Sequence, residues 1–299
     1  MIFGRALVEG TPVLVTSLGR RWLNLTRASR DYHRHVEGRE TAPLDGIPDM
    51  LAGGLFNRSF YRRIAEFVQR NNRLADYALP SPPELLLPWR PGKVIAVGRN
   101  YAAHVAEFDN QLPKEPVLFC KANSSCIGPG EAITFPESIG RVDHEGELGV
   151  VIGKRAGRVR REDARAYVAG YTLANDVTAR DMQRAAMAES NPWFVSKSMD
   201  TFCPIGPVVA LADALPWPVV TPVEVRVNGE TRQKSDTGRF IFSIPEVLEA
   251  VTRHITLEPG DLVITGTPEG VSPLKDGDLV EVMNPELGVL ANPVRALKS

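Results

Sequence analysis

The stretch DHEGELGVVIGKR (residues 143–155) places three acidic residues directly before an apolar run. The apolar residues 148–152 predict a buried strand. Side chains alternate between the two faces of a strand, so Glu145 and Glu147 are expected on one face and His144 on the other. Two carboxylates this close repel each other unless a positive group lies between them. A solvated strand end is the simpler explanation, so only a third acid in similar surroundings favours a site.

The stretch GYTLAND (residues 170–176) supplies such an acid, because it predicts a strand that ends in Asp176. A helix cap is the simpler explanation of this residue. In the helix predicted to follow, Arg180 and Gln183 share one face, although each is also consistent with an exposed position. Three carboxylates suit a hard ion such as Mg²⁺ or Mn²⁺ and leave roughly three coordination positions for water and a bidentate substrate. Zinc is not expected, since no cluster of Cys and His has ligand spacing.

Two further segments carry residues that can do chemistry. The stretch VGRNYAAHVAE (residues 97–107) predicts a strand, a turn and a short helix on which His104 and Glu107 face the same way. A carboxylate beside an imidazole raises its basicity, as general-base catalysis requires, whereas a surface helix pair is the ordinary alternative. Lys197 lies in VSKS (residues 195–198), which predicts a strand. Its side chain either faces the interior, where it can bind a substrate anion, or is that of an ordinary exposed lysine.

The N-terminal region differs from the rest of the chain. Residues 5–15 predict a hairpin broken at Gly10-Thr11-Pro12, and residues 59–75 predict a helix. The proline-rich segment 79–83 then predicts a linker.

From residue 91 onward, short β-rich runs alternate with glycine and proline turns. Helices are predicted only near residues 177–187 and 245–253. The run 223–227 followed by Asn228-Gly229 predicts a hairpin with a type I′ turn. This larger region is therefore predicted to be a closed or folded-over sheet.

Composition excludes several classes of protein. The net charge of −1 over 299 residues argues against nucleic acid or a membrane surface as the main partner. Three cysteines form neither a disulfide framework nor a zinc pair. Without a signal sequence or an apolar run of membrane-spanning length, the expected location is cytoplasmic. The lack of P-loop, GxSxG and GxGxxG motifs disfavours phosphoryl transfer, serine esterase chemistry and dinucleotide redox.

The chain resembles the fumarylacetoacetate hydrolase family in a set of ordered segments: VGRNYAAHVAEF (97–108), the stretch 116–133, DHEGELGVVIGKR (143–155), GYTLANDVTARDMQ (170–183), SKSMDTFCPIGP (196–207), VNGETRQ (227–233) and LEPGDLVITGTPEGVSPLKDGD (257–278). The resemblance implies an α+β, β-dominated fold in which a mixed β-sandwich roll surrounds a buried metal site. We accordingly predict a small N-terminal α+β domain over residues 1–90 and a catalytic domain over residues 91–299.

The resemblance also implies roles for individual residues. The metal ligands of the family match Glu145, Glu147 and Asp176. Its catalytic residues match His104, Glu107 and Lys197. Its substrate-binding residues match Arg180, Gln183 and Thr267. The implied cofactor is Mg²⁺ or Mn²⁺, with Ca²⁺ as a further option, and residues 186–193 and the lid after Glu107 are expected to set specificity.

The function implied by the resemblance is hydrolysis of a carbon–carbon bond in a small 2,4-dioxo acid of the acylpyruvate or fumarylpyruvate type, through a metal-stabilised enolate. The alternative is an isomerase or decarboxylase of 2-hydroxyhepta-2,4-dienedioate, hydroxymuconate or oxaloacetate in aromatic catabolism. A third reading, a non-catalytic metal-stabilised binding protein, is disfavoured because buried acids without a task are costly. The expected partners are a small 2-oxo acid and, as in many members of the family, a second copy of the chain in a homodimer.

Overall fold

Strand β10 (Gly146–Ile152) lies inside the larger of the two main sheets, and all of its residues are buried. A computed structural model of the chain, which describes residues 1–70, 72–79, 83–107 and 111–298, confirms the strand predicted there. Its antiparallel neighbours are β11 (Val168–Asn175) and β16 (Leu262–Ile264). A strand covered on both faces reads as a continuous apolar run, and this accounts for the sequence of β10.

The larger sheet has eleven strands in the described part of the chain. Along its main path the order is β3 (Arg21–Asn24), β2 (Thr11–Leu18), β1 (Ile2–Val8), β13 (Cys203–Leu211), β11, β10, β16, β5 (Val94–Gly98) and β6 (Val117–Lys121). Beside this path, β4 (Leu85–Leu86) pairs with β1 and β7 (Cys126–Ile127) pairs with β13. Because β1 pairs with β13, the N-terminal strands extend the sheet of the larger region. The domain boundary at residue 90 stays a prediction.

The second main sheet has five strands, in the order β15 (Glu230–Asp236), β14 (Pro222–Val227), β17 (Leu279–Asn284), β18 (Gly288–Leu297) and β8 (Ile133–Pro136). A two-stranded pair, β9 (Val142–Asp143) and β12 (Thr178–Ala179), stands apart from both. The predicted β14–β15 hairpin is confirmed, since Asn228 has φ 53° and Gly229 has φ 80°, as a type I′ turn requires.

The two main sheets share one apolar core, to which β10, β11, β14 and β17 all contribute buried valine and leucine side chains. Gly146, between the two glutamates, packs directly against Val225 and Val282 of the second sheet. A Cβ atom at Gly146 would lie 2.2 Å from Cγ2 of Val225 on β14. Packing between the sheets therefore requires a glycine at the centre of the Glu-Gly-Glu sequence. The two glutamates that flank it lie at the edge of the core.

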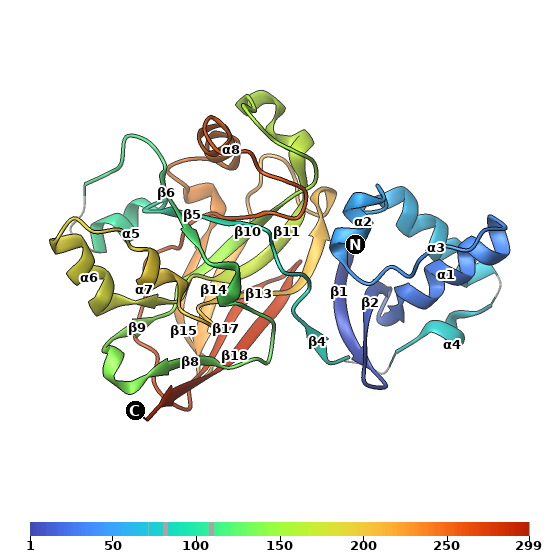
Figure 1. Cartoon of the computed structure of the whole chain (residues 1–299), viewed down its shortest axis with the longest axis horizontal. Helices are drawn as coiled ribbons and strands as arrows, with labels where there is room; N and C mark the ends of the chain where they lie inside the picture. The colour runs from blue at the N-terminus through green and yellow to red at the C-terminus, as the bar shows by residue number, and fades with distance from the viewer. Residues whose placement is uncertain (71, 80–82, 108–110, 299) are drawn as a thin grey trace.

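Four helices cover the N-terminal strands: α1 (Leu25–Val36), α2 (Ile47–Ala52), α3 (Arg58–Arg70) and α4 (Leu74–Tyr77). They form the blue part of the molecule on the right of Figure 1. The helix predicted over residues 59–75 is confirmed as α3 but ends at Arg70, and α4 follows separately. The first hairpin is also confirmed, with Glu9 and Gly10 at its turn. Residues 80–82 of the predicted linker lie outside the described residues.

The remaining α-helices belong to the larger region: α5 (Ala102–Glu107), α6 (Arg180–Ala188), α7 (Phe194–Ser198) and α8 (Ile244–Thr252). The first three lie at the same side of this region, on the left of Figure 1, and the candidate site lies beside them. Short 3-10 turns occur at Asn123–Ser125, Glu137–Ile139, Arg161–Tyr167, Ala212–Ala214 and Thr237–Arg239. The expected strand-dominated α+β fold is confirmed. In the described part of the chain, every helix is too short or too polar to cross a bilayer.

Candidate metal centre and active site

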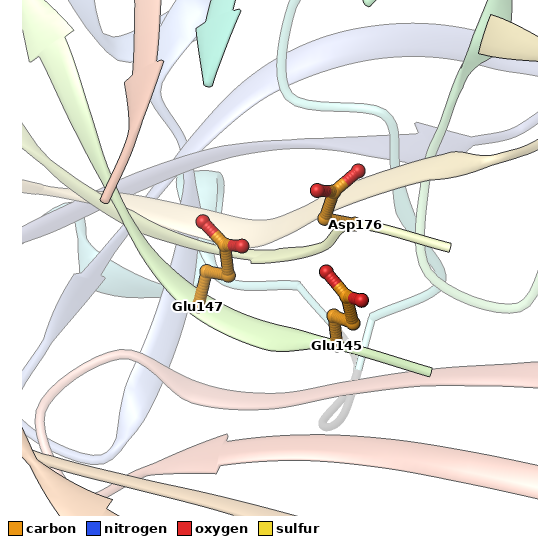
Figure 2. Close-up of side chains that lie close together, drawn as sticks. All are labelled: Glu145, Glu147 and Asp176. Carbon is orange, nitrogen blue, oxygen red and sulfur yellow. The ribbon is translucent and has the colours of Figure 1, made fainter. Parts of the chain in front are cut away.

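Glu145, Glu147 and Asp176 come together as the sequence predicts. Each offers a carboxylate oxygen, and these oxygens all lie within 4.8 Å of one another. The three side chains are almost fully buried, with relative exposures of 4%, 2% and 1%. Figure 2 shows them side by side at the ends of two neighbouring strands. Buried carboxylates this close to one another are typical of a cation site and do not fit the alternative of a solvated strand end.

The pairing of β10 with β11 creates this arrangement. Gly146 lies opposite Asn175 in the antiparallel register, so the residues that flank the two strand ends meet. The backbone N–H of Asp176 donates to the carbonyl of Glu145 at 2.8 Å, and the Asn175 side-chain oxygen accepts from the N–H of Glu145 at 2.9 Å. Two acids from one strand and one from the next are thereby fixed by the sheet itself.

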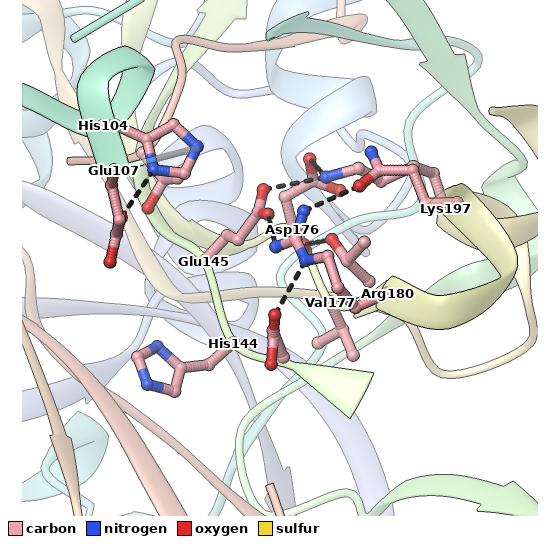
Figure 3. Close-up of polar contacts among 12 residues, drawn as sticks. His104, Glu107, His144, Glu145, Asp176, Val177, Arg180 and Lys197 are labelled. Atoms are coloured by element: carbon pink, nitrogen blue, oxygen red, sulfur yellow. Dashed lines mark hydrogen bonds and ion pairs between the residues drawn. The ribbon is translucent and has the colours of Figure 1, made fainter. Parts of the chain in front are cut away.

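Two cations reach the triad from the helices that follow it. Lys197 donates from Nζ to Glu145 at 2.8 Å and to Asp176 at 2.6 Å. Arg180 donates to Glu145 through Nη2 and to Asp143 through Nε. Figure 3 shows both cations on one side of Glu145, with His104 on the other. Because both cations are buried, these ion pairs hold the carboxylates in fixed orientations.

Lys197 was predicted in a strand, and this prediction is wrong. The residue lies in the short helix α7, where its N–H donates to the carbonyl of Trp193 at 3.2 Å. The apolar residues that resemble a strand, Phe194 and Val195, point outward and are 47% and 61% exposed. The helical turn buries Lys197 and Ser196 instead, so contacts with the triad override local β-propensity.

Two further residues of this network were not predicted from the sequence. Lys121, at the end of β6, is buried and donates from Nζ to Asp176 at 2.5 Å. Asp143 is fully buried between Arg180 and Arg141. A lysine that ends an apolar strand is a signal that could have marked Lys121, whereas only the folded structure shows that its partner is Asp176.

The electrostatics differ sharply between the two glutamates. Burial raises the pKa of Glu147 well above its usual range, and the nearby Asp176 and Glu145 raise it further. For Glu145 burial also acts to raise the pKa, but the attraction of Lys197 and Arg180 outweighs it, so the pKa is lowered. Glu147 forms no ion pair with any described residue and accepts a hydrogen bond from the N–H of Gly266 at 2.7 Å. An added divalent cation would compensate the charge of Glu147, and the residues present therefore fit a metal ion.

This fit predicts a measurable stabilisation by metal. At a free Mg²⁺ or Mn²⁺ concentration about a hundred times the Kd, binding to the folded state alone adds about 2.7 kcal/mol. For a chain of this length, calorimetry is expected to show Tm rising by roughly 4 °C relative to protein in EDTA. In Glu147→Gln, which keeps an acceptor for Gly266 but removes the charge, the shift should be largely lost. An equal shift in that variant would place the stabilising ion elsewhere.

His104 and Glu107 form the pair that their spacing predicts. Nδ1 of His104 lies 3.2 Å from a carboxylate oxygen of Glu107, and the His104 side chain is 11% exposed. Glu107 also accepts from the N–H of Gly270 at 3.2 Å, which ties α5 to the loop after Thr267. Residues 108–110, which belong to the predicted lid after Glu107, lie outside the described residues.

A cavity of about 180 Å³ brings the predicted residues together. Its walls include all three carboxylates as well as His104, Lys197 and Thr267. Glu107 does not line the cavity; it contacts Nδ1 of His104 and so orients the imidazole. The His144 ring, by contrast, points away from the triad (Figure 3) and forms hydrogen bonds with Gln233 and Ser272.

The predicted substrate-binding residues occupy the same cavity. Gln183 accepts from Nη1 of Arg180 at 2.7 Å, so the two share a helix face as predicted. The Thr267 hydroxyl donates to the carbonyl of Gly146 at 3.0 Å and accepts from Gln233 at 2.8 Å. Thr267 therefore ties its loop to Gly146, the residue between the two glutamates. Substrate contacts of these three residues stay predictions.

Comparison with known proteins relates the chain to a family of enzymes. The family model described as the C-terminal domain of fumarylacetoacetate (FAA) hydrolase matches residues 93–295. The mitochondrial oxaloacetate tautomerase Fahd2a of Rattus norvegicus is 37% identical over 276 residues, which cover 84% of this chain and 87% of the relative.

Two solved structures are similar over most of their length. The 5-carboxymethyl-2-hydroxymuconate delta-isomerase of Mycobacterium smegmatis is 32% identical, with a TM-score of 0.74 and full coverage of both chains. The fumarylpyruvate hydrolase of Pseudomonas aeruginosa, solved with Mn²⁺ and pyruvate, is 32% identical with a TM-score of 0.66. That match covers 73% of this chain and 94% of the hydrolase. The chain belongs to the fumarylacetoacetate hydrolase family.

Proposed function

We propose that this protein is a divalent-metal-dependent enzyme that converts small 2-oxo acids through an enolate. Its proposed main reaction is hydrolysis of a carbon–carbon bond in an acylpyruvate or a fumarylpyruvate-type acid. The observation that carries the proposal is the His104–Glu107 pair, whose imidazole lines a cavity that also holds Glu145, Glu147 and Asp176. Mg²⁺ or Mn²⁺ is the proposed ion, because the donors are all carboxylate oxygens.

The proposed ligands are the three carboxylates, and a divalent ion bound there would supply Lewis-acid stabilisation of negative charge on the substrate's oxygen atoms. Lys197 has two tasks in this proposal. Its ammonium holds Glu145 and Asp176 in place, and it adds positive charge beside the oxygen on which charge develops. Burial lowers the pKa of Lys197, but Asp176 and Glu145 outweigh burial and raise it, which keeps the ammonium charged at neutral pH.

His104 is the proposed base that activates water. With Nδ1 engaged by Glu107, Nε2 is the ring nitrogen assigned to take the proton from water. The resulting hydroxide attacks the distal carbonyl carbon of the 2,4-dioxo acid, and the bond between C3 and C4 breaks. The products are a carboxylic acid and the enolate of pyruvate, which regains a proton at C3. Gln183 and Thr267 are proposed to position the substrate in the cavity.

A second candidate is proton transfer without cleavage, as in keto–enol tautomerisation of oxaloacetate. The similarity to a mitochondrial oxaloacetate tautomerase favours it, and the similarity to a hydroxymuconate isomerase favours isomerisation by the same route. Both reactions need the enolate but no attack by water. The same residues would serve, and the fate of the enolate distinguishes the candidates.

Product analysis in ¹⁸O-labelled water tests the proposal. The Mn²⁺-loaded enzyme, incubated with acetylpyruvate or fumarylpyruvate, is expected to release pyruvate together with acetate or fumarate that carries one ¹⁸O from water. Oxaloacetate serves as the parallel substrate, with enol and keto forms followed by NMR. Rapid tautomerisation of oxaloacetate with no cleavage of either dioxo acid would reject hydrolysis in favour of the second candidate. Enzyme treated with EDTA is the control for metal dependence.

A further inference from the structure

Arg99 lines the active-site cavity from a backbone conformation that non-glycine residues rarely adopt. Its φ is 58°, in the left-handed region. The next residue, Asn100, locks this turn. Its side-chain amide donates to the carbonyls of Thr265 at 2.8 Å and Phe242 at 3.0 Å and accepts from the N–H of Phe242 at 2.7 Å. A non-glycine residue in this conformation is strained, and the surrounding contacts must offset that strain. These hydrogen bonds therefore fix the backbone of the turn, and with it the direction in which the Arg99 side chain leaves the backbone.

An aromatic wall connects Arg99 with the metal centre. The guanidinium carbon of Arg99 lies 5.7 Å from the ring centroid of Trp193. The Trp193 ring in turn packs edge-on against Phe119, with centroids 5.7 Å apart, and Nζ of Lys197 lies 5.2 Å from the Phe119 ring. All four residues line the cavity. One wall thus runs from the lysine at the triad, over two rings, to a second cation.

The cations of the cavity differ in their partners. Lys197 and Arg180 are saturated by buried carboxylates, as described above. Arg184 lies 3.8 Å from Asp181 and is 57% exposed. Arg99 forms an ion pair with no carboxylate among the described residues, and its guanidinium lies over the Trp193 ring. A guanidinium that lies on an aromatic face keeps its N–H donors free at its edge, in the plane of the guanidinium. There they match the two oxygens of a carboxylate.

We propose that Arg99 binds the distal carboxylate of the substrate, so that the enzyme selects 2-oxo acids that carry a second carboxylate at the far end of the chain. This inference rests on the proposed function, because it takes the 2-oxo acid end to lie at the triad. Trp193 supports the guanidinium, and the apolar middle of the substrate packs along Phe119 and Trp193. Arg184 contributes a smaller, screened attraction from the rim.

A matched pair of unreactive ligands tests this specificity. 2-Oxoadipate and 2-oxohexanoate have the same six-carbon chain and the same 2-oxo acid end, and they differ only in the distal carboxylate. Calorimetric titration of the Mn²⁺-loaded protein is expected to show roughly 10- to 100-fold tighter binding of 2-oxoadipate, as hydrogen bonds to a charged group provide.

Variants then assign the preference to Arg99. Arg99→Met keeps an unbranched stem against Trp193 but removes the charge. It should lose the preference for 2-oxoadipate while its Kd for 2-oxohexanoate stays within about twofold. Arg99→Lys keeps the charge and should retain part of the preference, which also covers the case that Arg99→Met folds poorly. Arg155→Met, at a site that is 76% exposed, is the matched control and should behave like the wild type.

Two results would overturn the inference in distinguishable ways. Equal affinity of the wild type for both ligands, or equal weakening of both by Arg99→Met, would make Arg99 a structural residue and leave the 2-oxo acid site standing. Binding of Mn²⁺ without binding of either ligand would reject the 2-oxo acid site itself, and the proposed function with it.

Discussion

Replacing Glu145 by alanine is expected to abolish detectable binding of Mn²⁺ and to lower turnover of 2-oxo acids by about 10²- to 10³-fold, the scale on which loss of key electrostatic stabilisation acts. Glu145 is one of only three carboxylates in the described centre, and it also holds both Lys197 and Arg180. Its loss removes a proposed ligand and frees the two cations to turn toward the remaining acids. The cost in stability should be moderate, because Arg180 keeps Asp143 and Lys197 keeps Asp176.

Metal affinity by calorimetry and turnover of the same preparation measure this effect. Glu162→Ala is the matched control, since that glutamate is 58% exposed and lies outside the cavity. Its metal affinity and activity should equal those of the wild type. Full turnover by Glu145→Ala in the presence of EDTA would contradict the metal mechanism, whereas turnover restored by high Mn²⁺ would show that Glu145 tunes affinity alone.

Much of the centre could be predicted because its geometry is local. The period of a strand places Glu145 and Glu147 on one face, and three-residue spacing on a helix places Arg180 beside Gln183 and His104 beside Glu107. These predictions depend on neighbours in the sequence, and the structure brings each pair together as expected.

The parts that could not be predicted depend on contacts between distant residues. Lys121 meets Asp176 across 55 positions of sequence, and the segment of Lys197 becomes helical once its side chain reaches the triad. Helix α1 was missed for a different reason. Its few apolar residues, Leu25, Ala28 and Tyr32, recur at helical spacing and are buried, but they are spread through a polar sequence; Asn24 caps the helix by accepting from the N–H of Arg27 at 2.9 Å. Capping by Asn24 and packing of this apolar face against the N-terminal strands stabilise that helix together.

The second large effect is expected at His104. Replacing His104 by alanine should lower hydrolysis of acylpyruvates by about 10²- to 10⁴-fold, the usual contribution of a general base. Mn²⁺ affinity should stay within about twofold, because none of the three carboxylates loses its partner. Glu107→Gln should have a smaller effect, since it leaves the imidazole in place and weakens only its orientation. His254→Ala, at an exposed position after α8, is the control.

The informative measurement on His104→Ala separates water attack from enolate formation. If His104 acts on water, exchange of the C3 hydrogens of pyruvate with D₂O should continue near the wild-type rate while hydrolysis is lost, because exchange needs the enolate but no hydroxide. Both rates can be followed by NMR in the same sample. Loss of both to the same extent would assign proton transfer at carbon to His104 and favour tautomerisation. Unchanged hydrolysis would remove the His104–Glu107 pair from the mechanism, because the base that activates water would then have to be another group in the cavity.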